Sequence, residues 1–266
     1  MVYWCCRPGP HWLPFLVAVG TPLTFVITYV ISVLNGHVEA GFPYISDTGT
    51  NSPESCIFGQ LLNINAVLVG IVVYIRYKQI IAYYRNEAIV QLYILKLNKA
   101  SLIIGILAGL GLSVVANFQE TNVLAVHLIG AFTGFACGCI YAWIHAVISY
   151  KMQAFVTHRA VCHLRLFLAI VVTLFFVLTS IFGMLSIRFK PKTGTKWFPD
   201  NAGFKYHVIS TSSEWVMSIG MMAYFLTFIR EFHRTNITPI QLSIYVPRGP
   251  IRDSRASADT YVANVM

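Results

Sequence analysis

Six apolar stretches, separated by polar segments, fill most of this 266-residue chain. Each stretch is close to the ~20 residues that a helix needs to cross the hydrocarbon core of a bilayer. A chain in lipid must satisfy its own backbone hydrogen bonds, so runs of this length predict helices. The stretches cover residues 12–34, 57–75, 100–116, 123–149, 164–187 and 208–229. We therefore expect an all-α, polytopic membrane protein that folds as a bundle of six transmembrane helices.

The composition of the chain agrees with this fold class. Only 11% of the residues are charged and the mean hydropathy is +0.65, whereas a soluble domain usually carries about 25% charged residues. The first stretch exceeds the ~7–15 apolar residues of a cleavable signal peptide, so we interpret it as an uncleaved helix. We predict a transmembrane domain over residues 1–232 and a disordered cytosolic tail over residues 233–266.

The distribution of Lys and Arg predicts the orientation, because cytosolic loops are enriched in both. With both termini in the cytosol, fourteen of the 19 Lys and Arg residues lie on the cytosolic side. The first two lumenal loops contain acidic residues and no Lys or Arg. The third lumenal loop departs from the rule, because it holds Arg188, Lys190, Lys192, Lys196 and Lys205. The count favours cytosolic termini, and the basic third loop is the exception.

The first lumenal loop holds the densest motif, which runs from residue 42 to residue 50. Its centre consists of Tyr44, Ser46, Asp47, Thr48 and Gly49. An Asp-Thr-Gly sequence favours a turn, because the Asp side chain can bond the backbone and Gly adopts unusual dihedrals. We predict an ordered loop held against the membrane surface. It is either a structured connector or a lumenal site for a headgroup or a partner around Asp47.

The sequence after this motif has the pattern of a helix start. Ser52 is a candidate N-cap, Pro53 fits the first helical position, and Glu54 favours the positive end of the helix dipole. We therefore predict that the second helix begins close to Ser52.

Four polar residues inside the apolar stretches are candidates for function: Asn63, His127, His207 and Glu214. Intramembrane ionisable groups are costly and often mark functional sites. Glu214 lies about two turns into the sixth stretch, away from the helix ends. The simpler interpretation is an interhelical hydrogen bond, for example from Glu214 to Asn63 or to a histidine.

Small residues mark a packing face on the fourth stretch, where Gly130, Gly134 and Gly138 recur every fourth residue. Small residues allow close helix approach in membranes. Packing within one chain and a homodimer interface both fit this pattern. At the N-terminus, Cys5 and Cys6 lie just before the first helix, so S-palmitoylation and ordinary reduced thiols are both open.

The sequence contains no recognisable catalytic or nucleotide-binding motif, so we expect no catalytic residues and no cofactor. His158, Cys162 and His163 cluster in sequence, but no fourth ligand follows at a zinc-like spacing, so we expect no metal. We also expect no nucleic-acid partner.

The chain resembles the damage-regulated autophagy modulator (DRAM) family, within the wider Frag1/DRAM/Sfk1 group, up to about residue 232. The octapeptide over residues 43–50, followed by Pro53-Glu54, is the most specific part of the resemblance. Matching residues then continue in order: Asn63, residues 76–78, 97–99 and 115–120, His127, Gly130, residues 149–150, Tyr206, His207, Glu214, Trp215 and residues 225–230.

The resemblance implies a lysosomal or endosomal multi-pass protein that promotes autophagy, in some members in connection with cell death (apoptosis). We expect it to organise membrane lipids or autophagy and lysosomal membrane proteins, without catalysis. One alternative is a plasma-membrane organiser of phosphoinositide signalling, favoured by the basic residues Arg76, Lys78 and Arg85. A second alternative is a membrane-embedded lipid hydrolase or remodelling enzyme that uses Asp47, His127, His207 and Glu214.

Overall fold

The structure, a computed structural model, describes residues 9–85, 92–152, 158–189 and 195–237. Within these ranges it is all-helical, as predicted, with six long helices and no strand. A short 3-10 helix η1 (Asp47–Gly49) and a one-turn helix α7 (Ile229–His233) complete it. The long helices are α1 (Trp12–Leu34), α2 (Glu54–Arg85), α3 (Leu92–Asn117), α4 (Leu124–Lys151), α5 (Arg159–Ile187) and α6 (Phe204–Leu226).

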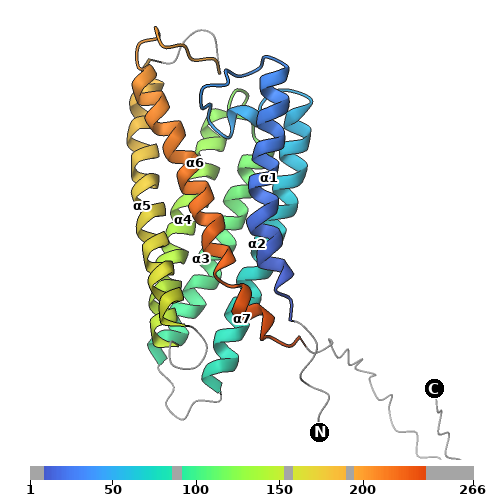
Figure 1. The fold of residues 1–266 in the computed structure, drawn as a ribbon, viewed down its shortest axis with the longest axis vertical. Coiled ribbons are helices and arrows are strands. Elements are labelled where there is room, and N and C mark those ends of the chain that lie inside the picture. The colour runs from blue at the N-terminus through green and yellow to red at the C-terminus, as the bar shows by residue number, and fades with distance from the viewer. Residues whose placement is uncertain (1–8, 86–91, 153–157, 190–194, 238–266) are drawn as a thin grey trace, which may run out of the picture. The chain divides into compact units, whose positions relative to one another are not determined.

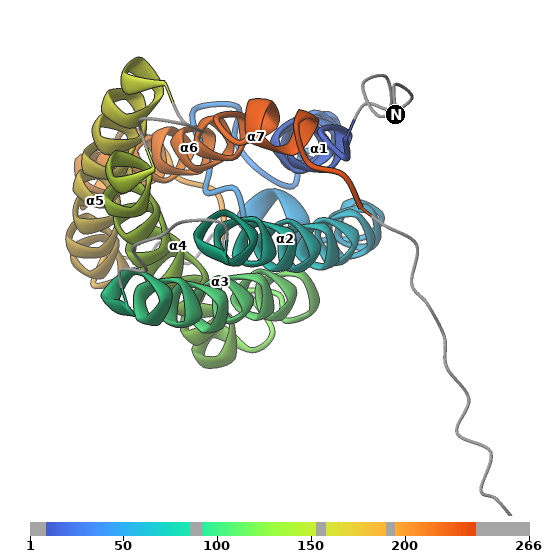
Figure 2. The same cartoon turned by 90° about the horizontal axis from the view of Figure 1, so that it is seen from below.

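The six long helices form a ring in chain order. Each helix packs on the next one, and α6 returns to pack against α1 (Figure 2). One end of the ring carries the loop with η1, and the other carries α7 and the start of α1 (Figure 1). We call these the η1 end and the α7 end. The predicted tail lies almost entirely outside the described residues.

The outer surface of the ring is apolar, as a membrane protein requires. Large apolar side chains are exposed along the helices, for example Val67, Phe132 and Ile219. Among the described residues, five helices are long and apolar enough to cross a membrane, namely α1 to α5. Helix α6 is not among these five, and its inner face includes buried Ser210, Thr211 and Glu214.

The predicted boundaries differ most at the α7 end. Helix α1 has the predicted limits, whereas α2 continues to Arg85 and α3 begins at Leu92. Both helices therefore extend beyond their apolar stretches into segments that contain Lys and Arg. The last predicted helix is shorter than expected at its end, because α6 stops at Leu226 before the chain turns into α7.

The start of α2 corrects a detail of the prediction. Its first residue is Glu54, so Pro53 precedes the helix and does not occupy its first position. The backbone N–H of Ser55 donates to the carbonyl of Asn51 at 2.7 Å. The buried Glu54 carboxylate pairs with His37, which ties the start of α2 to the segment that follows α1.

Candidate functional site

The loop before α2 folds into the η1 end of the ring and closes it. The backbone N–H of Ile45 donates to Oε2 of Glu214 at 2.8 Å. The indole N–H of the next residue on α6, Trp215, donates to the carbonyl of Pro43 at 3.0 Å. Two consecutive side chains of α6 therefore hold two backbone groups of the loop. The hydrogen bond predicted from Glu214 to Asn63 is not formed, because Asn63 bonds to α3 instead.

The Asp-Thr-Gly turn is buried, and the contacts of Thr48 and Gly49 explain why these two residue types fit there. The hydroxyl of Thr48 donates to the carbonyl of Ile45 at 2.7 Å and lies 3.0 Å from the hydroxyl of Thr28 on α1. A Cβ at Gly49 would lie 2.6 Å from Cδ1 of Phe58 on α2, so only glycine fits. Asp47 is 3% exposed. The turn is thus packed between α1 and α2.

An aromatic stack joins the loop to α6. The ring of His207 lies parallel to that of Trp197, with centroids 4.4 Å apart, and edge-on to Tyr44 at 5.1 Å. The phenol of Tyr44 lies 3.4 Å from the hydroxyl of Ser186 at the end of α5. Burial raises the pKa of Tyr44 to about 12. Tyr44 therefore contacts α5 and α6 as a neutral phenol.

Ser46 extends this network to the loop between α3 and α4. Its hydroxyl donates to Oε2 of Glu120 at 3.1 Å. One nine-residue segment, 42–50, therefore contacts α1, α2, α5, α6 and the loop between α3 and α4. The predicted ordered loop is present, and its five candidate residues all pack within the fold.

A narrow apolar cavity lies inside the ring beneath this loop. Its volume is about 110 Å³, and Ile45, Ser46 and Glu214 lie at its η1 end. Apolar cavities of ~150 Å³ stay dry and accept small apolar molecules. The remaining lining is almost entirely apolar or small and comes from α1, α2, α3, α4 and α6, including Leu62, Val69, Leu112, Phe135, Met221 and Phe225. The cavity can accommodate an apolar group such as part of an acyl chain.

Of the other predicted intramembrane residues, His127 lines the same cavity as Glu214, whereas Asn63 is not part of that lining. Asn63 exchanges hydrogen bonds with Asn117 at 3.0 Å and accepts one from Ser113 at 2.7 Å, which joins α2 to α3. A ring nitrogen of His127 lies 2.7 Å from the carbonyl of Phe118. Both residues therefore make interhelical or helix-end hydrogen bonds, which is the simpler of the two interpretations.

The glycine face of α4 packs within the chain. A Cβ at Gly111 of α3 would lie 2.7 Å from both the carbonyl oxygen of Gly130 and the Cα of Gly134. Gly138 faces α6 instead, where a Cβ would lie 2.9 Å from the terminal methyl of Met221. The face is occupied by neighbours in the same chain. A homodimer stays a prediction and would need another surface.

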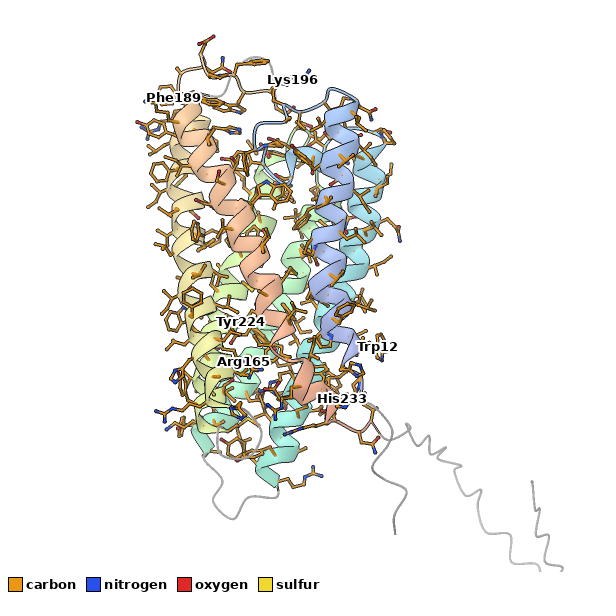
Figure 3. The ribbon with its side chains drawn as sticks, viewed as in Figure 1. Trp12, Arg165, Phe189, Lys196, Tyr224 and His233 are labelled. Carbon is orange, nitrogen blue, oxygen red and sulfur yellow. The ribbon has the colours of Figure 1, made fainter. Side chains whose placement is uncertain are left out.

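The α7 end contains a buried charged cluster that the sequence did not reveal (Figure 3). The guanidinium of Arg165 donates to Glu231 at 2.7 Å and to Thr227. The guanidinium carbons of Arg76 and Arg165 lie 5.1 and 4.6 Å from the ring centroid of Phe228. Both arginines are 0% exposed. The expectation that Arg76 attracts anionic lipid is therefore wrong, because its side chain is buried beneath the start of α7.

Comparisons with known proteins agree with the family resemblance. Residues 10–235 match the family described as the Frag1/DRAM/Sfk1/Cwh43P N-terminal domain. The chain is 39% identical to human DNA damage-regulated autophagy modulator protein 2 over 88% of both chains. It is 38% identical to the Xenopus laevis modulator protein 1, over 88% of this chain and 95% of that protein. No solved structure matches. The chain belongs to the Frag1/DRAM/Sfk1 family, among the damage-regulated autophagy modulators.

Proposed function

We propose that this protein is a multi-pass protein of lysosomal and endosomal membranes that promotes autophagy by organising lipids or protein partners. The observation that carries the proposal is the match over 88% of the chain to relatives named as autophagy modulators. The match includes the whole helical ring and the loop that closes it. The apolar cavity and the apolar outer surface support work on lipids.

The geometry favours a role without catalysis. The carboxylate of Glu214 accepts the Ile45 N–H, and His127 contacts a carbonyl. His207 is stacked between two aromatic rings. These groups are the ones that a lipid hydrolase would need as acids or bases. Lipidomics of cells that express Glu214→Gln tests this directly, because accumulation of one lipid class in the variant would favour the hydrolase.

A knock-out cell line complemented with tagged protein tests the main proposal. We expect the wild type to reach lysosomal membranes and to raise autophagic flux, measured as marker turnover with and without a lysosomal inhibitor. Asp47→Ala alters a buried residue of the η1 turn and is expected to lower flux or retain the protein in the endoplasmic reticulum. Glu39→Ala, a half-buried acidic residue earlier in the same loop, is the matched control.

Two results would contradict this proposal. Restored protein at lysosomes with no change in flux would remove the autophagy role. Location at the plasma membrane would favour the organiser of phosphoinositide signalling instead. That second candidate keeps support from basic side chains at the α7 end, including exposed Lys78 and Arg85.

The proposed orientation has its own test by engineered glycosylation. Glu39→Asn with Gly41→Thr creates an acceptor at the η1 end, and no heavy atom within 4 Å would meet a side chain at Gly41. Arg255→Asn creates a second acceptor in the tail. Glycosylation requires the lumen, so we expect a glycan on the first site alone. A glycan on the tail site alone would invert the orientation.

A further inference from the structure

An open pocket lies between α2 and α3 at the α7 end, and the cavity and the loop described above do not include it. Its volume is about 450 Å³, within the ~300–1,000 Å³ typical of small-molecule sites. Figure 2 shows the two helices side by side at this end. The lining residues are Tyr77, Ile81, Tyr84, Arg85, Leu95, Lys96 and Lys99.

The pocket combines an apolar floor with a cationic rim. Ile81, Leu95 and the rings of two tyrosines form the floor, and three exposed cations surround it. Among the described residues, none of these cations has an ion-pair partner. Helix α3 has no acidic residue, and the one acidic residue of α2 is at its far end. Glu87, the nearest acidic residue in sequence, lies outside the described residues.

The helix faces that line the pocket continue along α2 and α3 as an apolar strip. Residues of α2 that line the pocket recur at alternating spacings of four and three, which keeps them on one face. The same spacing leads from Tyr77 to Tyr74 and Gly70 on α2, and from Lys99 to Leu102 and Ile106 on α3. A Cβ at Gly70 would lie 3.7 Å from Cδ1 of Ile106, so the two helices meet along this line. Tyr74 and Ile106 are partly exposed to the surroundings of the ring, at 49% and 38%.

We propose that this pocket binds the headgroup of an anionic phospholipid that carries phosphate monoesters, with its acyl chains against the exposed apolar side chains of the strip. The three cations of the lining, Arg85, Lys96 and Lys99, fit a headgroup with several negative charges. Lys78, whose ammonium lies 5.5 Å from the Tyr74 ring centroid, adds a fourth cation beside the strip. Both helices are apolar enough to span a membrane, so their polar ends lie where headgroups lie.

The site deepens the lipid-organising role proposed above and rests on it. The residues of this site also differ from the three basic residues from which the sequence predicted attraction of anionic lipid. Arg76, one of the three arginines and lysines first considered, is fully buried against Phe228 and does not reach a headgroup. Lys96 and Lys99, on the opposite side of the α2–α3 connection, take its place.

Binding to the purified full-length protein tests the proposal. The protein is placed in phosphatidylcholine nanodiscs, and a fluorescent short-chain phosphatidylinositol bisphosphate is titrated while polarisation is measured. We expect saturable binding that Lys96→Gln/Lys99→Gln weakens at least about tenfold, because two charge-assisted contacts to the headgroup are lost. Lys151→Gln/Arg159→Gln removes two exposed charges from the same end, outside the pocket, and is expected to change the affinity less than about twofold at physiological salt, because these charges do not contact the headgroup and salt screens them.

Each other outcome overturns the proposal. Equal weakening by the control variant would show general attraction to a basic surface. Equal competition by soluble inositol trisphosphate would show that the apolar strip contributes nothing and that the ligand is not a lipid. Phosphatidylserine binding as tightly as the bisphosphate would remove the preference for phosphate monoesters. If the double variant loses its thermal transition, Arg85→Gln gives the same comparison at an exposed position.

Lipid binding and autophagic flux are measured separately, so the site and the proposed function can fail independently. Loss of flux in cells with intact binding would contradict the proposed function and leave the site in place. Intact flux in the wild type with no detectable binding would contradict the site and leave the proposed function in place.

Discussion

Substituting Gly111 by alanine tests the packing of α3 on α4. A Cβ at this position would lie 2.7 Å from the carbonyl oxygen of Gly130 and 2.7 Å from the Cα of Gly134. Both are backbone atoms, so no side-chain rotation can relieve the contact. Gly134→Ala is a matched control across the same contact, because its Cβ would meet its nearest neighbour, the backbone nitrogen of Leu112, at an ordinary 3.5 Å.

The magnitude follows from the distance that the helices must move. Non-bonded atoms prefer about 3.5–4.0 Å, so Gly111→Ala must separate α3 and α4 locally by about 1 Å. Overpacking of this kind costs about 1–3 kcal/mol, and the higher helix propensity of alanine offsets up to about 1 kcal/mol. The full offset leaves a net loss of about 0–2 kcal/mol, and we expect the upper half of this range because the contacts are to backbone atoms. A loss of about 1–2 kcal/mol corresponds to a melting temperature roughly 2–8 °C lower for a domain of this size. Gly134→Ala is expected to be neutral or slightly stabilising.

Thermal unfolding in detergent, followed with a thiol-reactive dye, measures this difference. The thiols of Cys139 and Cys162 are buried in the folded state, so their reaction reports unfolding. Exposed Cys56 contributes a constant early signal. Equal melting temperatures for Gly111→Ala and the wild type would refute the reasoning, as would an equal loss in Gly134→Ala.

Three further changes test the two ends of the ring. Glu214→Gln keeps an oxygen that accepts the Ile45 N–H and should cost less than about 1 kcal/mol, whereas Glu214→Leu leaves that donor unsatisfied and should cost about 1–3 kcal/mol, measured by the same unfolding assay. Glu231→Gln removes the charge that compensates buried Arg165 and should destabilise by about 3–5 kcal/mol; a loss below about 1 kcal/mol would show that α7 is not needed to cover the cluster. Because the raised pKa of Tyr44 favours the neutral phenol in the fold, its contribution to stability is complete below pH ~10 and is lost as the pH rises toward about 12. A difference titration of the wild type against Tyr44→Phe, followed by tyrosinate absorbance, should therefore show no ionisation near pH ~10.

Most of the fold was predictable because hydropathy reports the part of each helix that lies in lipid. The first helix was predicted with its observed limits, since its apolar run ends where the helix ends. The prediction failed where helices continue beyond the apolar core. Helix α2 extends ten residues past Ile75 through a segment rich in Tyr and basic residues, which hydropathy assigns to a loop.

The contacts within the site were less predictable because they join distant parts of the chain. The motif around Asp47 identified an ordered turn from local chemistry alone. The partner of Glu214 is a backbone N–H 169 residues away, and sequence patterns carry no signal for such an acceptor. The charged cluster at the α7 end joins α5 to α7 in the same way. One signal could have found α7, namely Phe228 and Phe232, which lie four residues apart across the end of the sixth stretch.

The closure of α6 against α1 has a consequence for biosynthesis. Helix α1 is synthesised first, but its inner face is fully covered only when α6, the last long helix, has been inserted. That inner face carries Thr21, Thr24 and Thr28, and each hydroxyl donates to a carbonyl four residues earlier in the same helix. Before α6 is inserted, α1 therefore presents no unsatisfied hydroxyl to lipid at these three positions. Helix α6 does not satisfy its polar groups alone in this way, because the carboxylate of Glu214 accepts a hydrogen bond from the loop before α2. A nascent chain that terminates before α6 should insert its first helices normally, yet remain an open arc that membrane quality control can recognise.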